Sequence, residues 1–304
     1  MTTIKKSIEI EKERLSYVQL DNIATLYKCN VMLNELEQDL LIHIISKIKN
    51  WGKQGEYSRI TFNANNFLRI TNRNTNTFDN IRKALEHLTN LPIKIGDYDN
   101  GHWLSWMTEK PKTSDFTVDI PEQIRSFLGY IEGLYVKFNA DYVYRLIGSY
   151  SKKIYMMLKA ALKGKQSESL KIELAELREL LSLGDKYQLY GHLKQRVLLA
   201  AKNEINKKTD IEISIEEIKN GHAVSQIEFI IFNNVENKID NSEENIIRNV
   251  LKQRGFFDKT IDAFIKYSHC DVEIIQRWEN KANEIFAKNQ SENEIENDEE
   301  LKNT

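Results

Sequence analysis

Apolar positions in the first half of the chain alternate between helical and strand spacing. Asn34, followed three residues later by Glu37, has the spacing of a capping box at the start of a helix. Asp99-Asn100-Gly101, between two short apolar runs, is typical of a hairpin turn. The patterns predict helices at 34–49, 65–70 and 78–88, a strand at 57–62 and a hairpin at 92–107. This order is that of a winged helix, a helix-turn-helix variant whose third helix enters the DNA major groove.

The same order recurs in the second half of the chain. The predicted elements are helices at 141–147, 149–163, 175–183 and 192–206, and strands at 169–174, 209–215 and 224–231. The last two strands enclose Lys219-Asn220-Gly221-His222, which predicts a second hairpin. Two similar modules of about 100 residues each fit the length of the chain.

We therefore predict an α+β protein with tandem winged-helix domains and a small C-terminal helical extension. A polar stretch indicates a linker after the second module, and the acidic C-terminal residues are predicted to be disordered. The predicted segments are an N-terminal charged arm at 1–14, the first winged helix at 15–133, the second at 134–232, the linker at 233–242, a helical unit at 243–288 and the acidic tail at 289–304.

Charge is unevenly distributed along the chain. The whole sequence has 43 basic and 45 acidic residues, a net charge of −2. Residues 145–208 alone contain 14 basic and 6 acidic residues, a net charge of +8, and the residues that follow are acidic. Such a block is typical of a surface that binds an anion, most often nucleic acid. A solvated basic helix face is the alternative, and charge alone does not separate the two.

Composition argues against several other classes of protein. Cys29 and Cys270 lie far apart, which excludes a disulfide scaffold or a cysteine-based zinc cluster and fits a reduced cytoplasm. No apolar run approaches the ~20 residues of a membrane span. The charged start of the chain lacks the apolar core of a signal peptide. We therefore expect a cytoplasmic protein that does not interact with membranes.

Motifs that carry catalysis are missing from the sequence. There is no glycine-rich phosphate cradle, and the six histidines do not have metal-ligand spacing. Tyr150 and Lys153 match the loose Y-x-x-K pattern of nickases, but the histidine pair that would bind the metal of such an enzyme is missing. We expect no catalytic residue, no metal and no cofactor. A nickase acting through Tyr150 stays as a minor alternative.

Basic residues of the second module are the candidate DNA contacts, because cations there can neutralise phosphates. Arg196 is the best candidate for reading a base, since its planar guanidinium can bind guanine through two hydrogen bonds. For any single lysine, a solvated surface position is the commoner alternative. The candidates in this module are Lys152, Lys153, Lys194, Arg196, Lys202, Lys207 and Lys208.

An ideal helical wheel orients the long helix of this module. Its apolar residues, Ala200 included, share one broad arc that is expected to face the core. Lys194 falls inside that arc and is expected to extend outward at the helix start. Arg196 and Lys202 flank the opposite face. The polar residues between them are Gln195, Asn203 and Asn206.

Four short motifs resemble those of one known family. The first is Tyr150-Ser-Lys-Lys-Ile-Tyr155 and the second is Leu177-Arg-Glu-Leu-Leu181. The third begins with Leu193-Lys-Gln-Arg-Val-Leu198 and continues through Ala201, Glu204-Ile205 and Thr209-Asp-Ile211. The fourth is Gly221-His-Ala-Val-Ser-Gln-Ile-Glu-Phe229. This series is similar to the RepB/RepE-type replication initiator proteins of theta-replicating plasmids. The resemblance covers about residues 20–232 and is strongest over 145–232.

The resemblance implies tandem winged helices that bind direct repeats (iterons) at a plasmid origin. It also implies opening of AT-rich DNA with host help, recruitment of the host replisome and repression of the initiator's own gene, often by a dimer. By the same resemblance, the third helix of the second module, with Lys194, Arg196 and Lys202, reads the major groove. The equivalent helix of the first module supplies Arg82 and Lys83, with Arg73 just before it.

Two functional interpretations from different classes thus remain, besides the nickase. The first is an initiator whose partners are double-stranded origin DNA and host replication proteins, with a homodimer through the first winged helix implied by the resemblance alone. The second is a transcriptional regulator with the same DNA-binding modules and no replication role.

Overall fold

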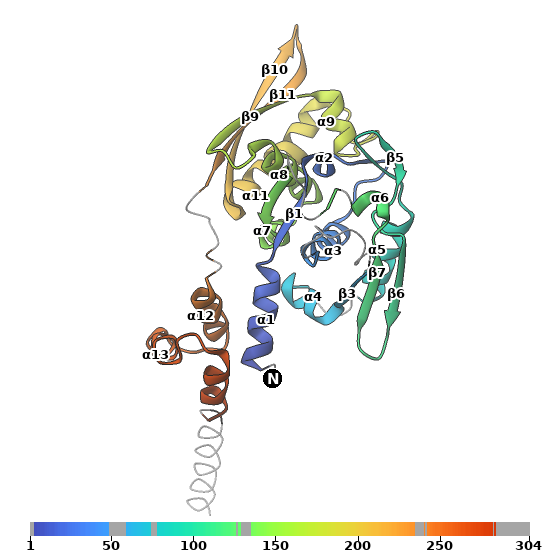
Figure 1. Ribbon diagram of the computed structural model, residues 1–304. Helices are drawn as coiled ribbons and strands as arrows, with labels where there is room; N and C mark the ends of the chain where they lie inside the picture. The colour runs from blue at the N-terminus through green and yellow to red at the C-terminus, as the bar shows by residue number, and fades with distance from the viewer. Residues whose placement is uncertain are drawn as a thin grey trace, which may run out of the picture. The chain divides into compact units, whose positions relative to one another are not determined.

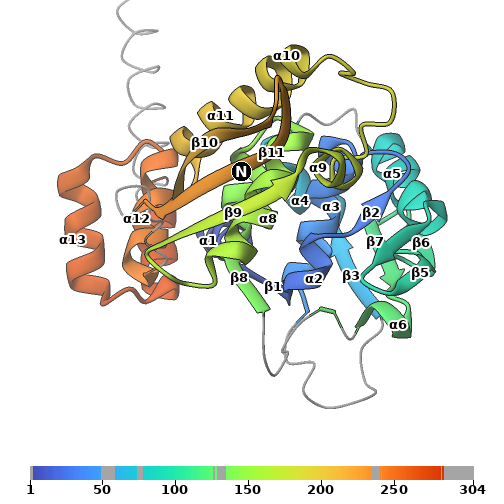
Figure 2. The same cartoon turned by 90° about the horizontal axis from the view of Figure 1, so that it is seen from above.

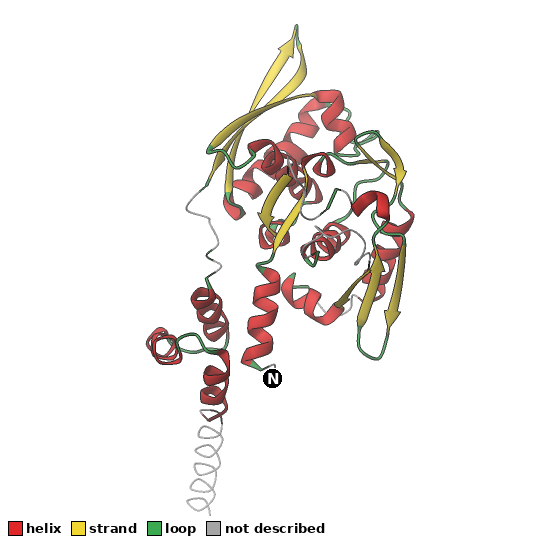
Figure 3. Ribbon diagram, in the orientation of Figure 1, coloured by secondary structure: helices red, strands yellow, loops and turns green. Residues whose placement is uncertain are grey.

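The computed structural model describes residues 3–48, 59–73, 78–125, 127–128, 135–234, 240, 242–281 and 283. The chain divides into two compact units. The larger unit spans residues 14–239 and contains both winged helices, and the smaller one combines residues 1–13 with residues 240–304 (Figure 1). Helices and strands alternate along the larger unit (Figure 3), which makes it an α+β fold.

The first winged helix has the predicted order of elements. It consists of α3 (Glu35–Ser46), β3 (Arg59–Asn63), α4 (Ala64–Ile70), α5 (Phe78–Asn90), β6 (Trp106–Lys110) and β7 (Asp115–Asp119). The strands form an antiparallel sheet in the order β3-β7-β6. The predicted capping box begins α3, because Asn34 accepts from the backbone of Glu37 and Glu37 accepts from the backbone of Asn34. The predicted end of this helix, at residue 49, lies outside the described residues.

The wing of this module is not the predicted hairpin. Residues 92–107 contain the hairpin of β4 (Ile93–Ile95) and β5 (Tyr98–Gly101), which pairs with β2 (Lys28–Cys29) in a separate sheet. Its turn lies at Gly96, with φ of 57°, and the predicted turn at 99–101 is wrong. Asn100 does adopt a positive φ of 59°, but it does so where the register of β4 and β5 shifts. The strands β6 and β7 form the wing instead.

The second winged helix repeats the arrangement. It consists of α8 (Ser149–Leu162), β9 (Ser167–Glu173), α9 (Leu174–Leu180), α10 (Tyr190–Leu193), η1 (Lys194–Leu199), α11 (Ala200–Lys208), β10 (Ile211–Asn220) and β11 (Ala223–Asn233). Its sheet order, β9-β11-β10, matches that of the first module. The predicted second hairpin is present, and Gly221 at its tip has a φ of 63°. The tip projects away from the module (Figure 1).

The third helix of this module is continuous from residue 190 to residue 208, because α10, η1 and α11 follow one another without a break. We refer to residues 190–208 as the basic helix. It begins two residues before the predicted start and contains a π-helical segment, η1. Figure 2 shows α10 and α11 beside the hairpin of β10 and β11.

The two modules are joined through a pair of strands. β1 (Tyr17–Asp21) pairs antiparallel with β8 (Tyr135–Asn139), so the start of the first predicted domain is hydrogen-bonded to the start of the second. Three short helices belong to this part of the chain: α2 (Asn22–Thr25) follows β1, α6 (Glu122–Arg125) follows β7, and α7 (Ala140–Arg145) follows β8. The predicted boundary between 133 and 134 lies outside the described residues, and the modules on its two sides share this two-stranded sheet.

Each module has its own apolar core. In the first, the rings of Phe62, Phe67 and Phe116 pack together, with Phe62 and Phe116 stacked 5.9 Å apart. In the second, Leu198 and Phe229 are fully buried. Burial of such side chains contributes roughly 1.5–3 kcal/mol each.

The smaller unit joins the two ends of the chain. The predicted N-terminal arm forms α1 (Ile4–Arg14), whose Ile4 and Ile8 are buried. Its side chains are bonded to helices from the other end of the chain, with Lys12 Nζ 2.6 Å from Glu243 and Arg254 Nη2 3.0 Å from Ser7 Oγ. The C-terminal helices are α12 (Glu243–Gln253), α13 (Asp258–Ser268) and residues 272–281. The predicted C-terminal helical extension and the predicted N-terminal arm therefore belong to one compact unit.

Several sequence predictions fall outside the described residues. These are most of the linker at 233–242, the end of the helical unit at 284–288 and the acidic tail at 289–304. Within the part of the chain that the structure describes, no helix is both long and apolar enough to cross a membrane.

Candidate nucleic-acid interface

The basic helix presents one face to the core of the second winged helix and another to solvent. Its buried residues are Leu193, Val197, Leu198, Ala201 and Ile205. The exposed residues from 194 to 208 are Gln195, Arg196, Ala200, Asn203 and Lys207. We call these five residues the reading face.

The π-helical segment explains a difference from the ideal wheel at Ala200. A π-helix pairs each N–H with the carbonyl five residues back, so it turns less per residue than an α-helix. Residues before Lys194 and after Leu199 therefore shift in phase relative to each other. Ala200, predicted to face the core, is exposed instead. Lys194, which falls inside the apolar arc of the ideal wheel and was expected to extend outward at the helix start, is half-exposed.

Three cations of the basic helix have no bonding partner in the described part of the chain. Arg196, Lys202 and Lys207 take part in no hydrogen bond or ion pair there, and Arg196 and Lys207 are exposed. Lys208 differs, since its Nζ lies 2.8 Å from Glu204. Three of the predicted contacts thus have charges that are available to an anion.

Lys194 is tied to the neighbouring hairpin. Its Nζ lies 2.7 Å from Glu217 Oε1 on β10, and the hydroxyl of Tyr190 donates to the same carboxylate at 2.8 Å. Hydrogen bonds from Lys194 and Tyr190 lower the pKa of Glu217, whereas burial and the nearby carboxylate raise the pKa of Tyr190. The hairpin and the start of the basic helix are thereby held together.

Two further side chains fix the C-terminal half of the basic helix. Glu204 accepts from the backbone N–H of Gly148 at 3.1 Å, next to the start of α8. Asn206 donates to the carbonyl of Ile213 at 3.1 Å and accepts from its N–H at 2.8 Å. Asn206 was predicted to lie between Arg196 and Lys202 on the outer face, but these bonds attach it to β10.

Arg178 organises the loop that precedes the basic helix. Its guanidinium donates to the carbonyls of Gly184, Lys186 and Tyr187 at 2.7–3.0 Å. Gly184 and Tyr187 both have positive φ, 50° and 53°, a conformation that needs support at Tyr187. Sequence reasoning missed Arg178, Glu204 and Glu217, because no local spacing indicates which distant group each one bonds.

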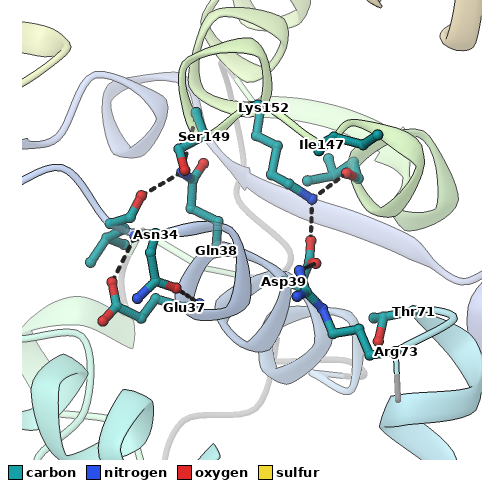
Figure 4. Close-up of polar contacts among 12 residues, drawn as sticks. Asn34, Glu37, Gln38, Asp39, Thr71, Arg73, Ile147, Ser149 and Lys152 are labelled. Atoms are coloured by element: carbon teal, nitrogen blue, oxygen red, sulfur yellow. Dashed lines mark hydrogen bonds and ion pairs between the residues drawn. The ribbon is translucent and has the colours of Figure 1, made fainter. Parts of the chain in front are cut away.

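Lys152 and Lys153 are not available to DNA in this structure, which corrects the prediction for both. They are 0% and 1% exposed. Lys152 Nζ is bonded to Asp39 on α3 and donates to the carbonyl of Val143 at 2.7 Å (Figure 4). Lys153 Nζ donates to the carbonyl of Tyr27 at 2.8 Å and lies 3.0 Å from the centre of that ring. Burial lowers the pKa of both lysines.

Arg73 belongs to the same buried cluster. Its Nη2 lies 2.6 Å from Asp39 Oδ2, so this carboxylate receives one cation from each winged helix (Figure 4). Beside it, Gln38 donates to the carbonyl of Ser149 at 3.1 Å. Arg73 is therefore part of the contact between the modules and not of an outward basic surface.

The predicted contacts of the first module are paired as well. Arg82 Nε lies 2.8 Å from Glu109 on β6, and its Nη1 lies 2.6 Å from Asp79. Lys83 Nζ lies 3.3 Å from the same Asp79. The bond between Arg82 and Glu109 parallels that between Lys194 and Glu217, since each joins a third helix to its wing.

Tyr150, the nickase alternative, packs edge-on against Tyr187 with ring centres 6.3 Å apart. Burial raises the pKa of its hydroxyl. Among the residues that the structure describes, no group of three histidine, cysteine, aspartate or glutamate side chains is placed to hold a metal ion.

Two winged helices in tandem, one of whose third helices carries three cations with no partner in the described residues, define a DNA-binding class of protein. Comparison with known families identifies the member of that class. Residues 18–159 match the family model described as "Initiator Replication protein, WH1", and residues 173–231 match "Initiator Rep protein, WH2". The chain belongs to this family of replication initiators, and its tandem winged-helix fold is confirmed.

Two solved structures were also matched, one of them with a TM-score above 0.5. The crystal structure of the Pi initiator protein in complex with iteron DNA has a TM-score of 0.59 and 15% sequence identity, and the match covers 73% of this chain and 99% of that one. Domains 2 and 3 of RctB match with a TM-score of 0.40 and 9% identity, over 67% of this chain and 82% of that one. No curated protein is detectably similar in sequence.

Proposed function

We propose that this chain is a plasmid replication initiator that binds directly repeated origin DNA in a sequence-specific manner. The basic helix enters the major groove. Arg196, Lys202 and Lys207 supply its contacts with DNA, because no acidic residue in the described part of the chain neutralises their charges. Family membership over both winged helices, together with these unpaired cations, is the observation that supports the proposal. The Pi initiator, a neighbour in fold, is described with iteron DNA, which agrees with it.

Further steps of the proposal rest on the family. The bound chain promotes opening of the origin in the cytoplasm, recruits host replication proteins and represses its own gene. A homodimer through the first winged helix is part of the same proposal, and sedimentation at graded protein concentration tests it. The activity uses DNA binding alone, without a catalytic residue, a metal or a cofactor.

A replication assay tests the initiator against the regulator. The gene and the DNA upstream of it are placed on a replicon that has no other origin. Colonies that depend on an intact gene are expected, and Arg196→Glu is expected to abolish them together with binding to the upstream repeats. Tight repression of the gene without any colonies would favour a transcriptional regulator.

A DNA cleavage assay tests the alternative that the protein is a nickase. Supercoiled DNA that carries the upstream repeats is incubated with the protein and Mg²⁺ or Mn²⁺. We expect the DNA to stay supercoiled, and nicking that is lost in Tyr150→Phe would overturn the non-enzymatic proposal.

A further inference from the structure

The reading face places three kinds of base-reading chemistry along one line of the basic helix. Arg196 and Lys207 are cationic, Gln195 and Asn203 carry amides, and Ala200 carries a methyl group. All five side chains are exposed, and neither amide has a hydrogen-bond partner in the described part of the chain. An unbonded amide on a helix that faces DNA is free to pair with a base edge.

The π-helical segment is what assembles this line. Because of this segment, Ala200 lies on the exposed side of the helix and not on the buried side that the ideal wheel predicts. The residues that remain on the buried side are Leu193, Val197, Leu198, Ala201 and Ile205. The reading face therefore includes a small residue between Arg196 and Asn203, where a bulky side chain would hold the helix away from the groove. π-Helical segments of this kind occur often at functional sites.

The chemistry of each side chain favours a particular base. A carboxamide forms two hydrogen bonds with N6 and N7 of adenine, a guanidinium forms two with O6 and N7 of guanine, and a methyl group packs against the methyl of thymine. Lys207, at the end of the helix, suits a phosphate.

We propose that Asn203 and Ala200 are specificity-determining residues of this interface, Asn203 for an adenine and Ala200 for a thymine methyl, on the same helix face as Arg196. The inference rests on the proposed sequence-specific DNA binding and extends it to A·T pairs beside the guanine that Arg196 reads. The site recognised by the second winged helix thus contains adenine and thymine at fixed positions, set by the spacing of these side chains along the helix.

Asn206 provides a matched control for Asn203. The two residues have the same chemistry and lie three positions apart, but both polar atoms of the Asn206 side chain are bonded to the backbone of Ile213. Asn203→Ala should change base preference and leave stability as it is. Asn206→Ala should lower the thermal midpoint and leave the base preference of the folded protein unchanged.

The first test selects binding sites from a randomised DNA duplex library with the full-length chain and both variants. We expect wild type and Asn206→Ala to select the same sequence. Asn203→Ala should lose preference at one adenine and bind the wild-type site about 5- to 100-fold more weakly, the range for one bidentate base contact, with binding to unrelated DNA unchanged. An unaltered preference at every position for Asn203→Ala would overturn the assignment of Asn203.

A second test isolates the methyl contact. Thymines of the selected site are replaced one at a time by uracil, which removes only the 5-methyl group. Wild type should lose a few-fold in affinity at one position, and Ala200→Gly, which lacks the side-chain methyl group, should be insensitive there. Equal sensitivity in both proteins would overturn the role of Ala200. Failure of the wild-type chain to select any sequence would instead overturn the proposed function itself.

Discussion

Two neighbouring helices of the second winged helix carry lysines and arginine from the same basic block, and they use them in opposite ways. On α8, Lys152 and Lys153 are buried and bonded to groups of the first half of the chain. On the basic helix, Arg196 and Lys207 are exposed and unbonded in the described residues. The same charge therefore joins the two modules on one helix and is available to a phosphate on the other. Burial, and not the density of charge in the sequence, separates the two roles.

The largest effect is expected for the buried lysines of α8. Lys152→Met leaves Asp39 buried without one of its two cations, and removing one partner of a buried pair costs about 3–5 kcal/mol. Denaturant unfolding should show this loss. The exposed Lys186→Met should change the free energy of unfolding by less than about 0.5 kcal/mol. Equal stabilities of the two variants would mean that the cluster of Lys152, Asp39 and Arg73 does not hold the modules together.

The second-largest effect, a loss of DNA affinity, is expected for the exposed cations of the basic helix. Arg196→Ala should weaken binding to the selected DNA site by about 10- to 100-fold, the range expected when a bidentate contact to guanine is lost. Its thermal midpoint should stay within a degree or two of wild type, because the side chain has no partner in the described structure. A marked loss of stability with unchanged affinity would place Arg196 with the structural cations and would reverse the comparison.

A smaller effect is expected for a phosphate contact. Lys207→Gln should weaken binding to all DNA sequences alike, by a few-fold at moderate salt. The slope of log affinity against log salt should fall by about 0.9, the value for one released counterion. Titrations at four or more salt concentrations measure this slope. A change confined to one DNA sequence would instead indicate that Lys207 contacts a base.

The smallest effect extends the comparison to the first winged helix. Lys83 is already paired with Asp79, and Arg82 with Asp79 and Glu109. Lys83→Gln should therefore change DNA affinity by less than about twofold and the salt slope by well under 0.9. A slope change as large as that of Lys207→Gln would show that Lys83 exchanges Asp79 for a phosphate on binding.

Sequence periodicity predicted the winged-helix elements of both modules, and the capping box of Asn34 and Glu37 is confirmed in detail. These features depend on contacts within a few residues, so a local pattern is enough to find them. The turn of the first hairpin was misplaced for the same reason. A positive φ at Asn100 is compatible with a shift in register as well as with a turn. The pairing of β4 with β2 decides which of the two forms.

The candidate site was predicted only in part. Arg196, Lys202 and Lys207 have no partner in the described residues and stay predicted DNA contacts, while Arg73, Lys152 and Lys153 are held by groups on other elements. Asp39 and Lys152 lie 113 residues apart. No spacing rule connects residues so distant, so the partner of a buried charge is invisible in a single sequence.

The amino-acid sequence by itself determined that this protein has two winged helices and a basic third helix in the second, because helical and strand periods and local charge are properties of short segments. Only the tertiary structure decided which cations point outward, which acids neutralise them, and that a π-helical segment moves Ala200 to the exposed face. The physical reason is that burial and ion pairing depend on distances in space, and packing brings together charges and backbone groups that are far apart along the chain.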